Sequence, residues 1–361
     1  MSLLNTRPTR TRPNNWAPLS VFALLALFIL GGGIAVYRHL AAQQIAEKQA
    51  SLQAIVRLKQ ESLTAWLRER AADAQLLASS PMVADEFADF LAGDASARKK
   101  VERHLSDMAW RYGYNNIHLL DPQGNSLLNV GPPGKAASPL HHDAPFRAEL
   151  TQVLKSRQIK LMDLHLDSDG QPHMGVIAPI ENAGHLIAVV FINIDPNHYL
   201  YPFIQRWPVH SDSGETLLVR REGETVLFLN ELRHRADSAL KLSVPMSSEN
   251  TVSVRTYNGA SLQNAVDYRG VPVVAATGFV PESNWLLIAK EDEAEANANL
   301  RTLAWFTGGG VLLALLGAGF ATLVLWQRSR LAEAEEIAVS ETTLRMVLEN
   351  SPDPVFVANP S

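Results

Sequence analysis

The 361-residue sequence is 47% hydrophobic and 19% charged, which is the composition of a folded chain and not of a disordered one. Its formal net charge is −5 and no segment is rich in lysine and arginine, so nucleic acid is not expected as a partner. The absence of cysteine excludes disulfide bonds, thiolate metal sites and cysteine nucleophiles.

Two long uncharged segments divide the chain. Residues 16–37 and 303–326 are each long enough for a helix that crosses a bilayer, which takes about 20 apolar residues. We therefore predict two transmembrane helices, with the membrane as a partner of the chain. The glycines at 31–33 and 308–310 are candidates for close helix contacts, although glycine is also common in such helices.

Charged residues beside these segments indicate their orientation. Residues 1–15 carry three arginines and no acid, and two arginines follow the second segment, so the positive-inside rule places both termini in the cytoplasm. Residues 38–302 are then extracytoplasmic, and the expected location is a bacterial inner membrane. The alternative is a cleaved signal peptide. The arginines are Arg7, Arg10, Arg12, Arg328 and Arg330, and the small residues that could allow cleavage are Ala41 and Ala42.

Residues 38–81 are predicted to form a stalk helix continuous with the first span. Their apolar residues are spaced by three, four or seven positions, which places them along one side of a helix. Pro81 is expected to end this helix. The apolar positions are Leu52, Val56, Leu63, Trp66, Leu67 and Leu77.

Residues 82–196 are predicted to form a first module that contains a sheet. Runs of apolar and β-branched residues alternate with turn sequences such as Asp-Pro-Gln-Gly at 121–124 and Asp-Ser-Asp-Gly at 167–170. A helix is expected at 145–157. The expected strands are residues 117–120, 126–130, 159–166, 173–180 and 186–194.

Residues 197–291 repeat this succession of elements, so the architecture is expected to be duplicated. Residues 292–302 are predicted to form a second stalk helix that leads into the second span, with acidic residues in its first turn. The strands expected in this second module are residues 215–221, 225–229, 240–245, 271–279 and 285–290.

Three stretches resemble the double Cache sensors of bacterial transmembrane receptors: IHLLDPQGNSLL, ETLLVRREGETVLFLNELRHR and DYRGVPVVAATGFVPESNWLLIAKEDEAEA. The resemblance covers residues 40–295. It implies an α+β fold with two tandem PAS-like sheets, mixed or antiparallel, on a long N-terminal stalk helix between two transmembrane helices. It also implies that a small-molecule ligand binds in the membrane-distal module, residues 82–196.

The residues after the second span predict a cytoplasmic helix at 327–350. Apolar positions spaced by three and four favour a coiled coil and therefore a parallel homodimer, and a single solvated helix is the alternative. Residues 351–361 contain a Pro-x-Pro break, which is expected to end this helix, and resemble the beginning of a cytoplasmic PAS domain. The spaced positions are Ala334, Ile337, Glu341, Leu344 and Leu348.

Polar and aromatic residues of the distal module are the candidates for ligand binding. Strict alternation along residues 159–167 places Asp163 and His165 on one face with Leu161, opposite Met162, Leu164 and Leu166. The alternative is that Asp163 and His165 line a solvent-facing side and that Asp195 caps a turn. The Arg-x-x-Trp-Tyr run of amino-acid-binding Cache receptors is not present, so amino acids are not assumed. The candidates are Tyr112, Tyr114, Arg147, Asp163, His165, His173, Asn193 and Asp195.

The histidines also suggest metal binding. His141 and His142 precede Asp143, and His165 and His173 are expected on neighbouring strands. The sequence lacks a ligand spacing typical of zinc sites, and prolines and glycine just before His141 favour a polar loop. We therefore predict no metal site and no cofactor.

No catalytic signature is present, so no enzymatic activity is expected for this chain. The resemblance implies the input region of a transmembrane receptor that senses an extracytoplasmic small molecule and passes a helix rearrangement to a cytoplasmic output. Cyclic di-GMP synthesis or hydrolysis is the expected output. The alternatives are a sensor histidine kinase and a membrane-anchored interaction protein without an output of its own.

Overall fold

The computed structural model describes residues 16–134 and 138–349. The predicted cytoplasmic N-terminus at 1–15 and the predicted beginning of a PAS domain at 351–361 lie outside these residues. The chain divides into two compact units. Residues 46–297 form one of them, and the described residues before and after this range belong to the other.

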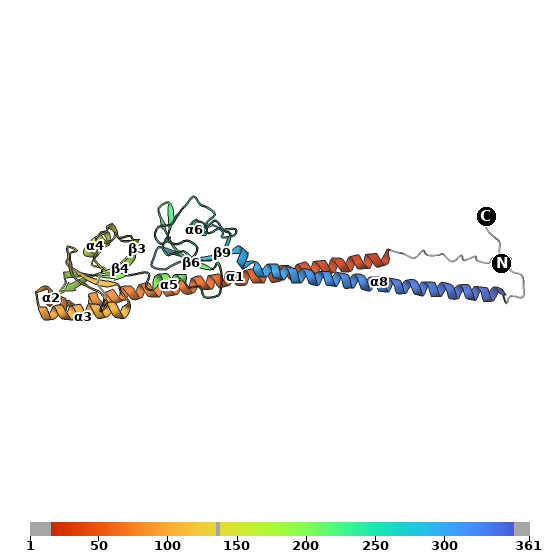
Figure 1. The fold of residues 1–361 in the computed structure, drawn as a ribbon, viewed down its shortest axis with the longest axis horizontal. Coiled ribbons are helices and arrows are strands. Elements are labelled where there is room, and N and C mark those ends of the chain that lie inside the picture. The colour runs from red at the N-terminus through yellow and green to blue at the C-terminus, as the bar shows by residue number, and fades with distance from the viewer. Residues whose placement is uncertain (1–15, 135–137, 350–361) are drawn as a thin grey trace, which may run out of the picture. The chain divides into compact units, whose positions relative to one another are not determined.

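The distal module contains a five-stranded antiparallel sheet in the order β2-β1-β5-β4-β3. Each of its strands overlaps the range predicted for it, and Figure 1 shows this sheet between α3 and α4. The strands are β1 (Asn116–Leu120), β2 (Ser126–Val130), β3 (Lys160–Leu166), β4 (Pro172–Asn182) and β5 (His185–Ile194).

The proximal module, residues 197–291, contains a second five-stranded antiparallel sheet, in the order β8-β7-β6-β10-β9. In both sheets the first strand of the module pairs with the second and with the last, so the predicted duplication is confirmed. Both sheets are antiparallel throughout. The strands are β6 (Glu215–Glu222), β7 (Thr225–Phe228), β8 (Ser243–Pro245), β9 (Val273–Phe279) and β10 (Trp285–Asp292).

Helix ends follow local capping chemistry. Helix α1 (Ala17–Ser79) ends just before Pro81, as predicted, and Ser80 caps α2 (Pro81–Leu91) by accepting a hydrogen bond from the amide of Val83. Asp94 caps α3 (Ala95–Tyr112) and Asp143 caps α4 (Ala144–Ser156) in the same way. The shorter helices are α5 (Leu200–Gln205) and α6 (Val252–Tyr257).

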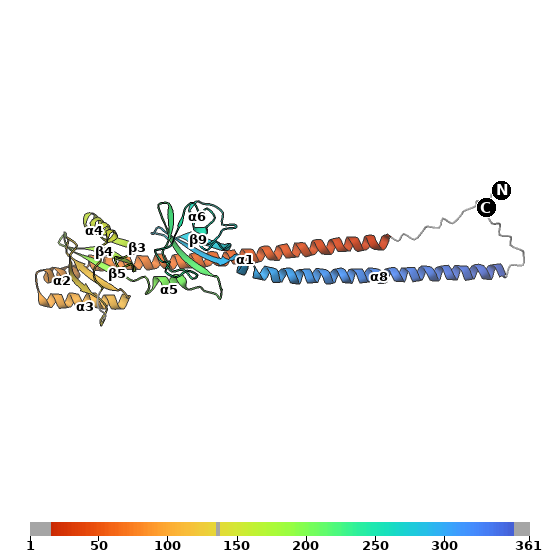
Figure 2. The ribbon, with the colours of Figure 1, turned by 45° about the horizontal axis from the view of Figure 1, so that its top comes forward.

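One hydrophobic core joins the stalk helix to both sheets. Every predicted apolar position of the stalk is buried, and these side chains pack with one face of the distal sheet and one face of the proximal sheet. A second core fills the space between the opposite face of the distal sheet and α4, so α3 and α4 lie on opposite sides of that sheet (Figure 2). The opposite face of the proximal sheet has a third core with α6.

A β-bulge in β3 changes which side chains share a face. Met162 pairs with Gly175 and His165 pairs with His173, so two residues of β3 oppose the single residue Met174 of β4. Met162 consequently lies in the core beside α4, whereas Leu164 lies in the core beside the stalk. The prediction that strict alternation places Met162 and Leu164 on one face is therefore wrong, because the extra residue reverses the alternation.

The second unit contains two helices that are long and apolar enough to cross a membrane. They are the N-terminal part of α1 and α8 (Ala298–Glu349), and a Cβ atom on Gly33 would lie 2.3 Å from Cγ2 of Val311. The predicted close helix contact is thus found at Gly33. A Cβ atom would meet nothing within 4 Å at the glycines at 31, 32 and 308–310.

The predicted stalk helix at 292–302 consists of two helices. Helix α7 (Glu293–Ala296) is a single turn, and α8 begins at Ala298. The carboxylate of Glu295 accepts hydrogen bonds from the hydroxyl of Ser211 and the amides of Asp212 and Ser213. These contacts attach α7 to the proximal module, which explains a separate turn ahead of α8.

Candidate functional site

A group of polar side chains, three of them buried and one half-buried, lies on the side of the distal sheet that faces α4. We call it the polar face and define it by Asn116, His118, Asn129 and Asn193. His118 pairs with Asn129 across β1 and β2, and Asn116 pairs with Asn193 across β1 and β5. Because side chains alternate along a strand and cross-strand partners share a face, all four lie on one surface.

The side chain of Asn116 is the centre of the polar face. Its Nδ2 donates to Oδ1 of Asn129 at 2.8 Å and to the carbonyl of Ser138 at 3.0 Å, while its Oδ1 accepts from Nδ2 of Asn193 at 3.0 Å. These partners determine the orientation of the amide group. The same Nδ2 lies 2.6 Å from Nε2 of His118.

The protonation state of His118 follows from this contact. Since the amide nitrogen of Asn116 cannot accept a hydrogen bond, a proton on Nε2 of His118 would face the hydrogens of that amide, so the proton of the neutral ring is on Nδ1. Burial, together with the nearby His141 and His142, lowers the pKa of His118 to about 4, so the ring is neutral at pH 7. His118 is fully buried, and Nδ1 has no hydrogen-bond partner within the part of the chain that the structure describes.

Asn193 leaves a second buried polar atom without a partner. Its Oδ1 accepts no hydrogen bond from the described residues, although the side chain is buried. The polar face therefore presents one unused donor, on His118, and one unused acceptor, on Asn193. An unsatisfied buried polar atom costs about 1–3 kcal/mol, so a ligand that supplied both partners would gain that free energy.

Three titratable side chains meet beside the polar face, and we call them the histidine cluster: Asp143, His165 and His173. Nε2 of His165 lies 3.1 Å from Oδ2 of Asp143, and the rings of His165 and His173 are 4.3 Å apart between centroids. Burial, followed by repulsion from His165, lowers the pKa of His173 to about 4. The three residues come from the N-cap of α4, from β3 and from β4.

A second group of the same chemistry adjoins the cluster. Nε2 of His141 lies 3.8 Å from Oδ2 of Asp167 and 3.6 Å from Oδ2 of Asp169. Oδ2 of Asp167 also lies 3.7 Å from Nδ1 of His173. Each of the two groups contains ligand atoms that lie within 4.8 Å of one another.

The structure brings together three of the eight predicted candidates: His165, His173 and Asn193 lie on the α4 side of the distal sheet. Tyr112 and Tyr114 lie on the stalk side instead. Tyr114 is buried in the stalk core and donates a hydrogen bond to Asp73 of α1, and the exposed Tyr112 accepts one from Arg70 through its carbonyl.

The other three candidates have different surroundings. Asp163 contacts the proximal module, because Oδ1 accepts from Nε1 of Trp285 at 2.8 Å and Oδ2 accepts from Nη1 of Arg220 at 2.7 Å. Arg147 is exposed on the first turn of α4. Asp195 accepts from the amide of Asn197, as the turn-capping alternative predicted.

The sequence reasoning missed Asn116, His118 and Asn129. A signal was present, because Asn116 and His118 alternate with Ile117 and Leu119 in a strand that is buried on both faces. Polar residues at alternate positions of a fully buried strand indicate a polar patch inside the protein.

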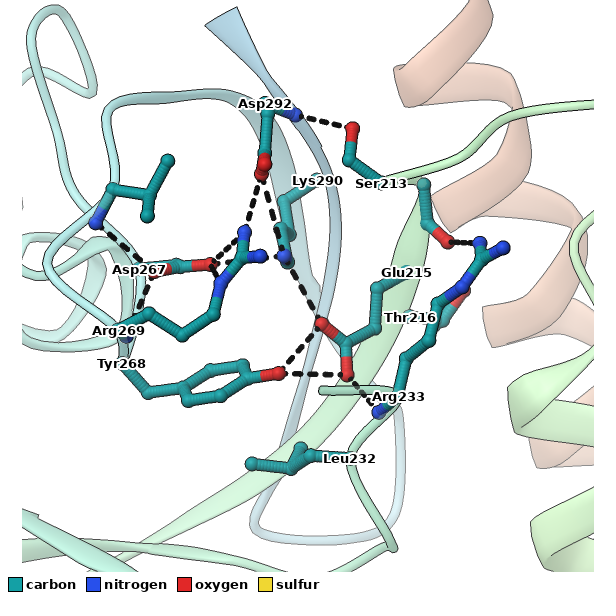
Figure 3. A network of polar contacts seen from close by, with 12 residues as sticks. Ser213, Glu215, Thr216, Leu232, Arg233, Asp267, Tyr268, Arg269, Lys290 and Asp292 are labelled. Atoms are coloured by element: carbon teal, nitrogen blue, oxygen red, sulfur yellow. Dashed lines mark hydrogen bonds and ion pairs between the residues drawn. The ribbon is translucent and has the colours of Figure 1, made fainter. Parts of the chain in front are cut away.

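The proximal module contains a buried charged network of a different kind (Figure 3). Nζ of Lys290 lies 2.9 Å from Oδ2 of Asp267 and 3.1 Å from Oε2 of Glu215, and Arg269 pairs with both Asp267 and Asp292. The charge and hydrogen bond of Lys290 outweigh the effect of burial and lower the pKa of Asp267. Two cations and three carboxylates are paired with one another in this network, so each of its charged side chains already has a partner within the module.

No model of a protein family matches the sequence, and a search of curated proteins found no match. Among solved structures, the extracellular domain of vpHK1S-Z8, a protein assigned as a histidine kinase, is 15% identical with a TM-score of 0.51. That match covers 72% of this chain and 96% of the other.

Two ligand-binding domains of chemoreceptors were also found. That of Campylobacter jejuni Tlp3, in complex with L-norvaline, is 14% identical with a TM-score of 0.48 and covers 71% of this chain and 95% of its own. That of Pseudomonas fluorescens CtaA, in complex with L-serine, is 15% identical with a TM-score of 0.45, and the match covers 69% of this chain and 98% of the other. The likeness to vpHK1S-Z8 shows a shared fold, and the predicted α+β architecture of two tandem sheets with a long N-terminal helix is confirmed.

Proposed function

We propose that residues 46–297 are the sensing region of a two-span transmembrane receptor, and that its distal module binds a small polar molecule at the polar face. The observation that carries this proposal is a pair of buried atoms, Nδ1 of His118 and Oδ1 of Asn193, that have no hydrogen-bond partner among residues 16–134 and 138–349. Native proteins rarely leave such atoms without a hydrogen-bond partner. A bound ligand could be the partner that the protein itself does not provide.

The two atoms define the ligand chemistry. A group that accepts a hydrogen bond, such as a carboxylate or a carbonyl oxygen, suits the N–H of His118, and a hydroxyl or amino group suits Oδ1 of Asn193. Phe191 supplies an apolar neighbour, because its ring stacks on His118 at 5.9 Å between centroids. The expected ligand is therefore small and has a donor and an acceptor a few bonds apart.

The orientation and the output belong to the same proposal. The arginines beside the two spans favour an extracytoplasmic sensing region with both termini in the cytoplasm. We expect a parallel homodimer in the bacterial inner membrane that controls cyclic di-GMP synthesis or hydrolysis, and the alternative output is a histidine kinase. A ligand can shift such a receptor only if it binds its two states with different affinity.

The test is ligand-dependent thermal melting of the full-length protein in detergent, with a panel of small metabolites. A ligand at about a hundred times its dissociation constant should stabilise the protein by about 2.7 kcal/mol, which raises the melting temperature. Asn193→Ala removes the unused acceptor and should abolish the rise. Gln123→Ala, in an exposed turn of the same module, is the matched control and should keep it.

A metabolite that stabilises Asn193→Ala as much as the unchanged protein would contradict binding at the polar face. Stabilisation by a periplasmic protein, unaffected by Asn193→Ala, would favour the membrane-anchored interaction protein instead.

A further inference from the structure

The tautomer of His165 is determined by a backbone contact. Nδ1 of His165 lies 2.9 Å from the carbonyl oxygen of Asp163, which only accepts, so Nδ1 carries a proton. In the neutral ring Nε2 then carries a lone pair and no hydrogen, and this nitrogen lies 3.1 Å from the carboxylate oxygen Oδ2 of Asp143. Two acceptors at this distance require a positive charge between them. A proton or a metal ion can provide it.

A backbone hydrogen bond of this kind is a recurring feature of histidines that bind metals. The nitrogen that does not bind the ion donates to a carbonyl or a carboxylate, which orients the ring. His165 has this arrangement through the carbonyl of Asp163, and Nδ1 of His141 lies 2.7 Å from the hydroxyl of Ser168, which can either donate or accept. In both rings the nitrogen that remains, Nε2, points to carboxylate oxygens.

Asp143 and Asp167 each bind backbone amides with one carboxylate oxygen and face histidines with the other. Oδ1 of Asp143 accepts from the amide of Phe146, and Oδ1 of Asp167 accepts from the amides of Asp169 and Gln171. Their Oδ2 atoms are left to the histidines. Backbone hydrogen bonds therefore hold both carboxylates in position while one oxygen of each stays available.

The charge of this region is negative. Every ion pair that Asp143, Asp167 and Asp169 make within the described residues is with a histidine, and none is with lysine or arginine. The side chains of Asp143 and Asp167 are only 12% and 11% exposed. Because partly buried carboxylates without a permanent cation are costly, a bound cation would stabilise this region.

We propose that Asp143, His165 and His173 bind a divalent transition-metal ion of the zinc class. Two atoms bound to one tetrahedral zinc at about 2.0–2.1 Å lie about 3.3 Å apart, close to the 3.1 Å between His165 Nε2 and Asp143 Oδ2. Imidazole and carboxylate ligands without thiolate suit zinc and its neighbours better than calcium or magnesium. Asp167 lies outside this set of ligands, with its Oδ2 3.7 Å from Nδ1 of His173.

This site goes beyond ligand binding at the polar face and does not depend on it. The ion would join the bulge of β3, the strand β4 and the first turn of α4. The three ligands are 22 and eight positions apart along the chain, which explains why no zinc spacing is visible in the sequence.

The experiment measures zinc binding to the full-length protein in detergent, purified without a histidine tag and stripped with a chelator. Competition with a coloured zinc chelator gives the number of ions bound and the dissociation constant. One tightly bound ion per chain is expected. His165→Ala/His173→Ala should raise the dissociation constant by roughly 100-fold or more.

Asp143→Asn keeps the helix cap, since asparagine caps as well as aspartate, and removes the ligand charge. It should weaken zinc binding by roughly 10-fold or more while the melting temperature without metal changes little. The control is His104→Ala/His210→Ala, in which two exposed histidines of the same chain are lost. This control should bind zinc as the unchanged protein does.

The proposal is overturned if the unchanged protein binds no zinc, or if it binds no more tightly than His165→Ala/His173→Ala. Retention of full affinity in Asp143→Asn would remove Asp143 from the site and overturn the assignment of the three ligands. These outcomes do not depend on whether a metabolite binds at the polar face, because the experiment measures zinc itself.

Discussion

At the scale of single residues, the distal module combines well-satisfied turns with an incompletely satisfied face. Asp121 and Asp167 occupy the first position of an Asp-x-x-Gly turn, and Asp267 does so in the proximal module. In each turn Oδ1 accepts from the amides two and four positions later, and the glycine has a positive φ. His118 and Asn193 differ from these aspartates because each has a buried polar atom without a partner in the part of the chain that the structure describes.

His118 should make stability depend on pH. Its pKa is about 4 in the folded protein and about 6.5 when unfolded, so between these values the unfolded state binds more protons. The stability that the neutral ring contributes is complete above pH 6.5 and is lost as the pH falls toward 4. His118→Gln should therefore reduce the slope of the free energy of unfolding against pH, by at most about 1.4 kcal/mol per pH unit.

Urea unfolding of residues 46–297 at pH 5 and pH 7, followed by tryptophan fluorescence, measures this difference. His104→Gln, at an exposed position of α3, is the control and should keep the original slope. An unchanged slope in His118→Gln would mean that the buried ring is not the group that titrates.

At the scale of elements, the two modules are fastened to α1 and to each other. Nζ of Lys59 in α1 donates to the carbonyls of Phe203, Ile204 and Arg206 at the end of α5. Burial, with repulsion from Arg206, lowers the pKa of Lys59 to about 8. Asp163 links β3 to Arg220 of β6 and Trp285 of β10. Asp163 therefore connects the edge of the distal sheet to β10, the strand that leads into α7.

Asp163→Ala should destabilise the contact between the modules. It leaves the indole N–H of the buried Trp285 without its acceptor and removes one partner of Arg220, which should cost about 1–3 kcal/mol of unfolding free energy. Urea unfolding of residues 46–297 is the measurement. Glu224→Ala, which removes an exposed ion pair with Arg221, should cost about 0–1 kcal/mol. Equal effects of the two substitutions would show that the contact contributes nothing.

At the scale of the whole molecule, each of the two units has its own kind of packing. Residues 46–297 bury extensive apolar cores, whereas the spans expose their apolar side chains and meet through small residues such as Gly33. That is the pattern expected of helices whose surroundings are lipid, where close approach replaces the hydrophobic effect as the source of packing.

The contact at Gly33 can be tested by cross-linking, because the chain has no cysteine of its own. A Cβ atom on Gly33 would lie 3.7 Å from Cβ of Val311, which fits the separation of about 3.8 Å in disulfides. Gly33→Cys/Val311→Cys should therefore form an intramolecular disulfide in the membrane. Maleimide labelling before and after reduction detects it. Gly32→Cys/Val311→Cys should stay unlinked, and equal linking of both pairs would contradict this helix contact.

The sequence by itself determined the features that depend on neighbouring residues. Long apolar runs predicted both spans, the spacing of Leu52 to Leu77 predicted the buried side of the stalk, and turn residues separated the strands. Within the site, His165, His173 and Asn193 were predicted because they are polar residues on predicted strands of the right module.

Only the tertiary structure decided which of these residues meet. The bulge of β3 turns His165 toward His173 and Asp143, and a partner 57 positions later in the chain takes up Asp163. Asn116 and His118 belong to a strand whose burial depends on α4 packing over it. Such contacts form between residues far apart in sequence, and a local pattern carries no information about the partner that packing will bring.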